Sequence, residues 1–167
     1  MIYTCAYRSS LGAMTLAGGD EGLVGCWFLG QKYFERGLPA GARPGVHPIL
    51  DEAGCWLDLY FAGQNPDFMP KLSPQGTPFQ KEVWDILRTI PYGKTMTYGE
   101  IAKIIAARRG VSRMSAQAVG GAVGKNPITI FIPCHRVMGA DGQLTGYAGG
   151  TLKKRALLDL ERDGRPT

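Results

Sequence analysis

The stretch TYGEIAKIIAARRGVSRMSAQAVGGAVG (Thr97–Gly124) decides how the C-terminal half of this chain folds. In its first part, isoleucines recur at helical spacing, which predicts a helix that starts at Thr97 and ends near Gly110. Its second part predicts another helix, from about Ser112 to Gly124. Because two short helices joined by a tight turn are typical of a helix-turn-helix, we expect that element here.

The second predicted helix carries almost no bulky side chains, since it contains Ala116, Ala118, Gly120 and Gly121. A helix this thin can pack closely against another helix. Its backbone can also approach a nucleic-acid groove, and a narrow minor groove favours such a helix. The sequence alone leaves both explanations open.

A further helix is predicted just before this element. Thr77 supplies an N-cap, and Pro78 suits the first helical position. The apolar residues that follow share one helical face until Pro91-Tyr92-Gly93 ends the helix. These apolar residues are Phe79, Val83, Ile86, Leu87 and Ile90.

The N-terminal half has the pattern of a small sheet. Short apolar segments separated by turns predict strands, and Trp56–Phe61 (WLDLYF) alternates like a half-buried strand. Residues 36–48 and 64–78 are rich in Gly and Pro, so we expect a loop and a linker. The sequence thus predicts an α/β (α+β) protein with a supporting domain at 1–75 and a second domain at 76–167. The other predicted strands are Met1–Arg8, Gly12–Leu16 and Leu23–Leu29.

The composition is that of a globular protein, with 44% hydrophobic residues in a chain of 167. No apolar run approaches the roughly 20 residues of a membrane span. The segment from Met1 to Cys5 lacks the basic and apolar regions of a signal peptide. We therefore expect a cytoplasmic protein with no membrane partner.

Charge is distributed unevenly along the chain. Residues 1–75 carry 5 basic and 7 acidic side chains, whereas residues 76–167 carry 14 and 7. A solvated basic face accounts for this excess without any ligand. The alternative is a C-terminal half that binds a polyanion such as nucleic acid.

The four cysteines are Cys5, Cys26, Cys55 and Cys134, and no two of them form a Cys-x-x-Cys pair. With only two histidines in the chain, this spacing disfavours a structural zinc site. The length of the chain and its lack of a secretion signal disfavour a disulfide framework. Because scattered cysteines are more often buried small hydrophobes, a chemical role has to be argued from their neighbours.

Cys134 stands in the cluster PCHR (Pro133–Arg136), after an apolar segment at 128–132 that we expect to be a strand. Cationic neighbours lower the pKa of a thiol, and a base can deprotonate it. Neighbours on a strand face opposite sides, so His135 needs a bend or a water molecule to reach the thiol. An isolated Cys-His pair is more often a buried cysteine beside a surface histidine.

Several motifs in a fixed order accompany this cluster. IPCHRV (Ile132–Val137) follows Asn126-Pro127 and precedes TGYAGG (Thr145–Gly150). Together with three further segments, these motifs resemble the O6-alkylguanine-DNA alkyltransferase family over about residues 76–163, and more weakly over the N-terminal half. The further segments are PFQKEVWDILRTIPYGKTMTYGEIA (Pro78–Ala102), AVGGAVGKNP (Ala118–Pro127) and ALLDLE (Ala156–Glu161).

The resemblance implies direct reversal of alkylation damage in double-stranded DNA. Cys134 would take the alkyl group from O6 of guanine and keep it as S-alkylcysteine, so each molecule would react once. His135 would accept the thiol proton through a water molecule, and Glu161 would orient His135, as in a catalytic triad. Tyr98 would rotate the nucleotide and donate a proton to the leaving base, and Asn126 would brace the active-site turn. O4-alkylthymine is implied as a second substrate.

The remaining implied residues bind the DNA and the base, which has to leave the duplex to react. Gln117 stands where the family has an arginine that fills the gap in the duplex, and glutamine lacks the charge and planar fork of arginine. Arg113, one turn earlier, would partly compensate. The base pocket would include Val137, Tyr147, Ala148, Gly149 and Gly150. The DNA-binding residues would be Tyr98, Arg113, Ser115, Ala116, Gln117, Gly120 and Gly121.

No cofactor is implied, and we expect a monomer. Some family members bind zinc near the N-terminus, but Gly19 and Val24 occupy two of those ligand positions, so no metal is expected. Two other classes of function stay open. One is a DNA-binding sensor of alkylated bases that does no chemistry, and the other is a hydrolase that uses Cys134 and His135.

Overall fold

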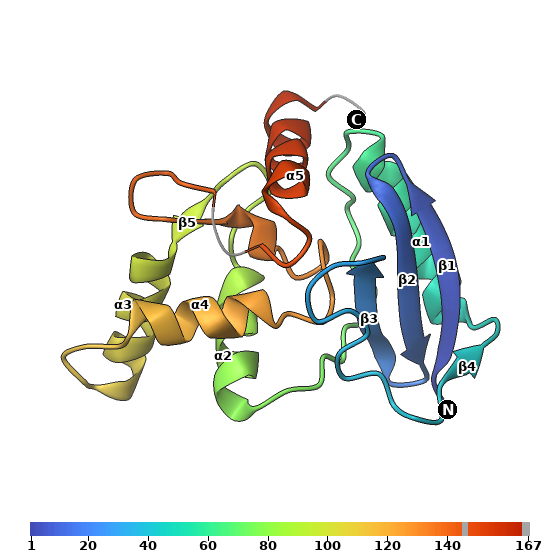
Figure 1. The fold of residues 1–167 in the computed structure, drawn as a ribbon, viewed down its shortest axis with the longest axis horizontal. Coiled ribbons are helices and arrows are strands. Elements are labelled where there is room, and N and C mark those ends of the chain that lie inside the picture. The colour runs from blue at the N-terminus through green and yellow to red at the C-terminus, as the bar shows by residue number, and fades with distance from the viewer. Residues whose placement is uncertain (145–146, 165–167) are drawn as a thin grey trace.

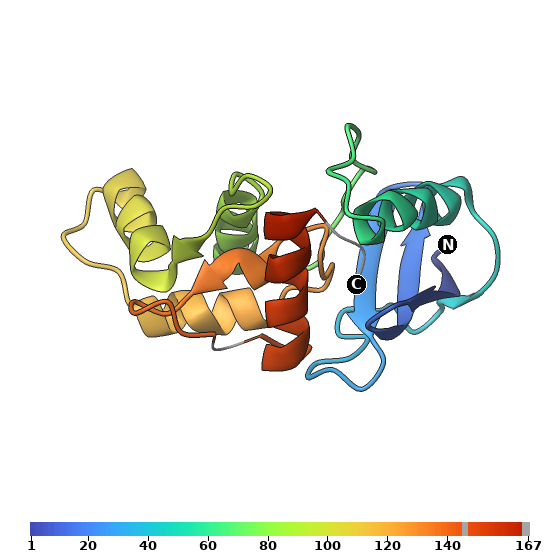
Figure 2. The ribbon, with the colours of Figure 1, turned by 90° about the horizontal axis from the view of Figure 1, so that it is seen from above.

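The computed structural model of the chain describes residues 1–144 and 147–164. A sheet backed by a helix forms one part, and a group of helices forms the other (Figure 1). Seen from above, the two parts lie side by side (Figure 2). This arrangement confirms the predicted α+β class.

The N-terminal sheet has four strands in the order β3-β2-β1-β4. β1 (Tyr3–Ser9), β2 (Gly12–Gly19) and β3 (Gly22–Phe28) form an antiparallel meander, which confirms the three predicted strands. β4 (Arg43–Pro44) pairs with β1 in parallel and lies within the segment expected to be only a loop. The helix α1 (Pro48–Phe61) covers one face of this sheet (Figure 1).

The prediction of a strand at Trp56–Phe61 is wrong, because these residues form the last part of α1. The ring nitrogen of His47 accepts a hydrogen bond from the backbone of Ile49, and Pro48 occupies the first turn, so the chain enters a helix there. Six residues are too few to distinguish strand alternation from a helical period, so the start signals upstream decide the structure. The buried side chains follow a helical period: Ile49, Leu50, Ala53, Trp56, Leu57, Tyr60 and Phe61.

The C-terminal helices begin where cap residues predicted them. In α2 (Pro78–Leu87), Thr77 and Gln80 form a capping box, and in α3 (Tyr98–Arg109), Thr97 and Glu100 form another. The helix predicted from Ser112 is shorter than expected. It is α4 (Ala116–Gly124), because the Ser115 hydroxyl caps the backbone N–H of Ala118 and fixes the start there.

Three short elements and one long helix complete the fold. β5 (Met96–Thr97) and β6 (Val137–Met138) form a parallel pair, and a 3₁₀ turn, η1 (Cys134–Arg136), precedes β6. The long helix is α5 (Thr151–Asp163), whose N-cap position is Gly150. Within the described residues, no helix is both long and apolar enough to cross a membrane.

The strand predicted at 128–132 is also wrong. Ile130 has a φ of 75°, a left-handed conformation that a β-branched residue rarely adopts and that breaks extended structure. What remains is an irregular segment along the edge of β3. There Cys26 donates a backbone hydrogen bond to Pro127 and accepts one from Thr129, both at 2.9 Å. The segment that carries Cys134 is thereby anchored to the N-terminal sheet.

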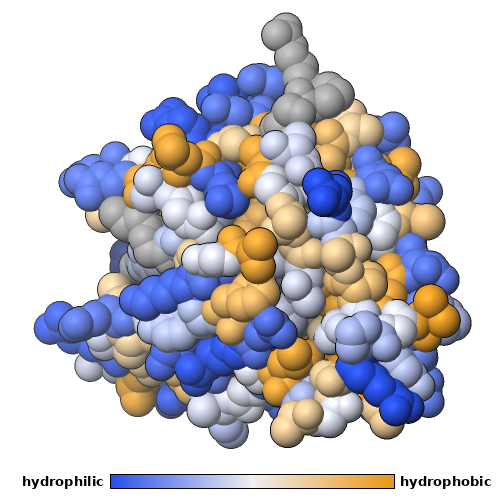
Figure 3. Space-filling view, turned by 45° about the vertical axis from the view of Figure 1, so that its right-hand side comes forward, coloured by the Kyte–Doolittle hydropathy of each residue, from blue (hydrophilic) through white to orange (hydrophobic). Residues whose placement is uncertain are grey.

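One buried cluster runs through both parts of the molecule. It includes Leu16 and Trp56 from the N-terminal part and Ile86, Ile132 and Leu157 from the C-terminal part. On the face shown in Figure 3, hydrophobic residues occur in small groups among polar ones, and strongly hydrophilic side chains gather toward the left margin. The division into domains at 1–75 and 76–167 stays a prediction.

Candidate active site

A tight turn presents Cys134. Pro133 has φ −81° and ψ 65°, the geometry of an inverse γ-turn, and the backbone N–H of Cys134 donates to Ile132 over 2.8 Å. Asn126 braces the approach to this turn from both ends. Its side-chain amide donates to the carbonyl of Ile132 over 2.7 Å, and its side-chain oxygen accepts from the N–H of Ile128 over 2.9 Å.

His135 is fully buried and is held by Glu161 of α5. Its Nε2 lies 2.5 Å from Oε2 of Glu161. Burial lowers the pKa of His135, and the charges of Arg136 and Lys154 lower it further against the opposing effect of Glu161. Although burial raises the pKa of Glu161, the hydrogen bonds and charges of His135 and Arg136 outweigh it and hold that pKa well below its usual value. A neutral imidazole therefore faces an ionised carboxylate.

This pairing fixes which nitrogen of His135 can accept a proton. The carboxylate only accepts hydrogen bonds, so Nε2 carries the hydrogen and donates it to Glu161. Nδ1 is then the basic nitrogen. It is buried, and it has no hydrogen-bond partner among the described atoms. The arrangement is that of a base whose orientation a carboxylate sets.

Glu161 also binds residues outside the predicted site. Arg136 donates to it twice, through Nε over 2.8 Å and Nη2 over 3.1 Å. The backbone N–H of Gly93 and the hydroxyl of Tyr60 donate over 3.0 Å and 2.6 Å. Arg136 belongs to the PCHR cluster that the sequence singles out. Tyr60 has no such signal, because it lies in the part of α1 whose sequence predicts a strand.

A buried lysine lies near the thiol. Lys154 of α5 has no exposed surface, and its Nζ donates to the carbonyl of Val137. Burial lowers the pKa of Lys154 to about 8, and the nearby thiol of Cys134 opposes that shift. Burial in turn raises the pKa of Cys134, while the hydrogen bond from Asn126 and the charge of Lys154 act against the rise. No sequence signal indicated Lys154, because a lysine on a surface-like helix normally faces solvent.

Tyr98, at the start of α3, lies between α4 and Lys154. A methyl group placed on Gly120 would lie 3.8 Å from the Tyr98 ring, so the ring packs on the bare side of α4. The Nζ of Lys154 is 5.9 Å from the centre of the same ring. The structure thus brings Tyr98 close to the ammonium group of Lys154, which donates to the carbonyl of Val137 and whose charge acts to lower the pKa of Cys134.

A cavity of about 300 Å³ opens beside α4. Tyr147 and Ala148 line it together with Gly120, Gly121 and Gly124. Its other wall comes from Lys32 and Tyr33 of the N-terminal part. Tyr147 is buried, and the proximity of its hydroxyl to Cys134 adds to the effect of burial in raising the pKa of Tyr147. This volume suits a small flat molecule.

The other residues assigned to the base pocket lie close by. Val137 is buried directly after η1, and Ala148 precedes two glycines. A methyl group on Gly149 would come within 2.7 Å of the Tyr147 ring, so only glycine fits there. Thr145 and Gly146 of the predicted TGYAGG motif lie outside the described residues.

α4 packs closely on one side and is exposed on the other. Its buried face, with Val119, Ala122 and Val123, packs into the core, and Trp84 of α2 donates to the carbonyl of Ala122 over 2.9 Å. The opposite face is open to solvent. Four of the assigned DNA-binding residues lie on α4 and two precede it, and all six are exposed or partly exposed: Ala116, Gln117, Gly120 and Gly121 on the helix, and Arg113 and Ser115 before it.

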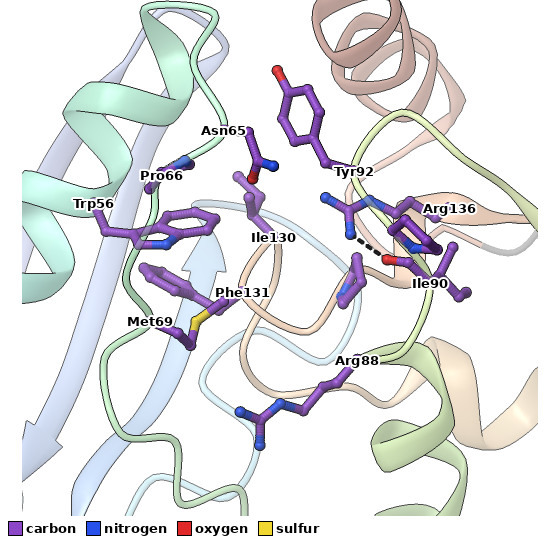
Figure 4. A pocket seen from close by; sticks show the side chains of 12 residues that line it. Trp56, Asn65, Pro66, Met69, Arg88, Ile90, Tyr92, Ile130, Phe131 and Arg136 are labelled. Carbon is purple, nitrogen blue, oxygen red and sulfur yellow. Dashed lines mark hydrogen bonds between the residues drawn. The ribbon is translucent and has the colours of Figure 1, made fainter.

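A second cavity, of about 330 Å³, lies behind this site at the junction of the two parts (Figure 4). Trp56, Met69 and Phe131 form its apolar wall, and Arg136 reaches its edge, where Nη1 donates to the carbonyl of Ile90 over 2.7 Å. Cys134 lines neither this cavity nor the cavity beside α4. In the described part of the chain, no group of three His, Cys, Asp or Glu side chains is arranged to hold a metal ion.

Comparison with known proteins agrees with this geometry. Residues 78–163 match the family described as "6-O-methylguanine DNA methyltransferase, DNA binding domain". The methylated-DNA--protein-cysteine methyltransferase of Methanosarcina mazei is 52% identical over 162 residues, which cover 97% of this chain and 98% of that protein. The protein of the same name from Methanosarcina acetivorans is 45% identical over 161 residues, or 96% and 98% of the two chains.

A solved structure gives the same answer at the level of the fold. The crystal structure of Mycobacterium tuberculosis OGT in complex with DNA superposes with a TM-score of 0.86 at 42% identity, covering 99% of this chain and 96% of that one. Because the relatives match over nearly their whole length, the likeness includes both parts of the molecule. The chain belongs to the 6-O-methylguanine DNA methyltransferase family.

Proposed function

We propose that this chain repairs O6-alkylguanine in DNA by moving the alkyl group onto Sγ of its own Cys134. The observation that carries the proposal is the buried chain of contacts from Glu161 to His135 to the turn that presents Cys134. A neutral histidine with a free Nδ1 provides a base for a thiol whose pKa burial raises. Such a thiol needs this base to become a nucleophile.

The transfer balances with the groups present in the site. The thiol proton moves to Nδ1 of His135 through a water molecule, and the imidazolium that forms is stabilised by Glu161. Sγ then forms a bond to the alkyl carbon as the bond from that carbon to O6 breaks. Tyr98 donates a proton to N3 of the leaving guanine, which departs intact. The Tyr98 phenolate then regains a proton through solvent from the imidazolium of His135, so that the thiol proton is in effect passed to the guanine. Lys154 stabilises the thiolate by its charge while its ammonium group stays protonated.

The reaction uses each molecule once. The product is a thioether, which is a poor leaving group, and none of the residues assigned to the site is suited to removing the alkyl group. The chain is therefore a reagent consumed in repair rather than a catalyst that turns over. O4-alkylthymine is a second proposed substrate, since it offers the same kind of alkyl-oxygen bond at a base edge.

Access to a base inside a duplex requires its extrusion. We assign the open face of α4 to the minor groove, with Gln117 in the gap that the base leaves. The cavity lined by Tyr147, Ala148 and the α4 glycines then receives the base. We also propose a cytoplasmic location, which cell fractionation with an antibody against the chain would test.

One experiment tests the proposed function. The protein is mixed with duplex DNA that carries a single O6-methylguanine, and both products are analysed by mass spectrometry. The expected result is loss of the methyl group from DNA and its appearance on Cys134, with one event per chain. Tight binding without transfer would instead identify a sensor, and repeated turnover on esters or amides would identify a hydrolase.

A further inference from the structure

The loop that follows β3, residues 31–38, lies beside the DNA-binding helix. Figure 2 shows this loop on the same side of the molecule as α4. Lys32 and Tyr33 of the loop line the same cavity as Gly120 and Gly121 of α4. An element of the N-terminal part therefore borders the face assigned to DNA.

The loop is fastened at its base. Gln31 is buried, and its side-chain oxygen accepts a hydrogen bond from the backbone of Phe28 over 2.8 Å and from the hydroxyl of Thr129 over 3.4 Å. The next residue, Lys32, donates its backbone N–H to the carbonyl of Ala148 over 3.0 Å. These bonds hold the loop against the wall of the base cavity.

Three cations gather around the ring of Tyr33. The charged groups of Lys32, Arg36 and Lys125 lie 5.2, 5.6 and 5.8 Å from its centre. Two of them come from the loop, and Lys125 comes from the end of α4. In the described part of the chain, none of the three forms an ion pair with a carboxylate. Their positive charge is thus left for a ligand.

The backbone of the loop is held in an unfavourable form. Tyr33 has a φ of 60° and Glu35 a φ of 58°, so two non-glycine residues separated by a single residue adopt the left-handed conformation. Such outliers persist where the surroundings enforce them, and they cluster at ligand-binding sites. Tyr33 is also 37% exposed, so the residue that the three cations surround is accessible to a ligand.

We propose that Lys32, Arg36 and Lys125, arranged around Tyr33, bind backbone phosphates of DNA beside the extruded nucleotide. The inference rests on the proposed function for the position of the DNA. The N-terminal part then contributes directly to substrate binding, and Tyr33 keeps the three cations together against their mutual repulsion. Contacts of this kind carry no sequence information but set affinity and its dependence on salt.

The test uses Arg36→Ala/Lys125→Ala, because neither side chain lines the base cavity. Binding of the full chain to an unmodified DNA duplex is measured by fluorescence anisotropy at several salt concentrations. Each phosphate contact contributes a slope of about −0.9 to log K against log salt. We expect the slope for the double variant to be shallower by about 2. The matched control is Arg8→Ala, which removes an exposed cation from β1.

A second readout separates phosphate binding from shaping of the cavity. Alkyl transfer from the free O6-alkylguanine base, which has no phosphate, should change less than about twofold in the double variant. The proposal is overturned if the slope for the double variant equals that of the Arg8→Ala control. It is also overturned if reaction with the free base falls as much as reaction with the duplex. The salt slope does not depend on alkyl transfer, so failure of the proposed function would show separately, as unmodified Cys134 in the unsubstituted protein.

Discussion

The hydroxyl of Tyr60, on the helix that covers the N-terminal sheet, donates a hydrogen bond to Oε2 of Glu161 over 2.6 Å. The same oxygen contacts Nε2 of His135 at 2.5 Å. The hydroxyl itself lies 3.4 Å from that nitrogen. Glu161 therefore receives hydrogen bonds from both parts of the molecule, and the histidine that we propose as the base for Cys134 shares its carboxylate with a residue 74 positions before the thiol in the sequence.

Tyr60→Phe should slow alkyl transfer while leaving affinity for DNA unchanged. A hydrogen bond to a charged group contributes about 1.5–3 kcal/mol, so we expect the transfer rate to fall by about tenfold or more. Single-turnover kinetics measure this effect. Tyr7→Phe is the matched control, because the Tyr7 hydroxyl also donates to a carboxylate, that of Asp58 on α1, over 2.7 Å, but in an exposed hydrogen bond. Loss of stability at an unchanged transfer rate would show that Tyr60 only supports packing.

Lys154→Met should remove a charge that favours the thiolate. In the unsubstituted protein, the ammonium group is lost as pH rises through about 8, so the transfer rate should fall on the alkaline side of that value. The variant should transfer more slowly at neutral pH, by about tenfold for one unit of thiol pKa. It should also lack the alkaline decline. The rate measured from pH 6 to 10 checks both, and a decline near pH 8 that persists in Lys154→Met would assign it to another group.

Glu161→Gln should destabilise the fold and should also weaken the hold of residue 161 on His135. Removing one partner from a buried ion pair costs about 3–5 kcal/mol of the free energy of unfolding. The folded pKa of Glu161 lies below its unfolded value, so the ionised carboxylate stabilises the protein above about pH 4.3. That contribution is lost as pH falls further. Melting temperatures from pH 3 to 7 should thus drop less steeply on the acid side for Glu161→Gln, and parallel curves would refute the assignment.

Gln117→Arg should speed reaction on duplex DNA more than reaction on the free alkylated base. Gln117 is exposed on α4, where an arginine would add a charge and a planar group for the gap in the duplex. The free base needs no extrusion, so it reports on the pocket alone. Competition between the two substrates in one reaction gives the ratio of the transfer rate on duplex DNA to the transfer rate on the free base. Equal acceleration of both would rule out a role for this position in holding the duplex open.

The helices of the C-terminal part could be predicted because their start signals are local. Thr77 and Thr97 each cap a helix within four residues of sequence, and the structure shows both caps. The same kind of signal, Pro48 after His47, precedes Trp56–Phe61 by eight residues, so it lies outside that six-residue segment. The alternation within the segment therefore predicts a strand, whereas the start signal upstream predicts the helix that forms.

Other features had no local signal to read. The left-handed conformation of Ile130 opposes the preference of a β-branched residue, and it occurs in a segment that hydrogen bonds to Asn126 and to the edge of β3 hold in place. Tyr60 and Glu161 are 101 residues apart, so their contact arises from the packing of α1 against the C-terminal part. The family resemblance suggests Cys134, His135 and Glu161, and Arg136 follows directly in the same motif. No sequence signal indicates Tyr60, which completes the network from the N-terminal part.

Peptide mass spectrometry of the protein after reaction with one equivalent of O6-methylguanine duplex tests the central claim most directly. The account predicts a gain of one CH₂ on the peptide that contains Cys134, none on the peptides that contain Cys5, Cys26 or Cys55, and no further gain with excess DNA. Cys134→Ser should bind the same duplex and gain nothing. Methyl loss from DNA with Cys134 unmodified, or more than one methyl group removed per chain, would contradict the account.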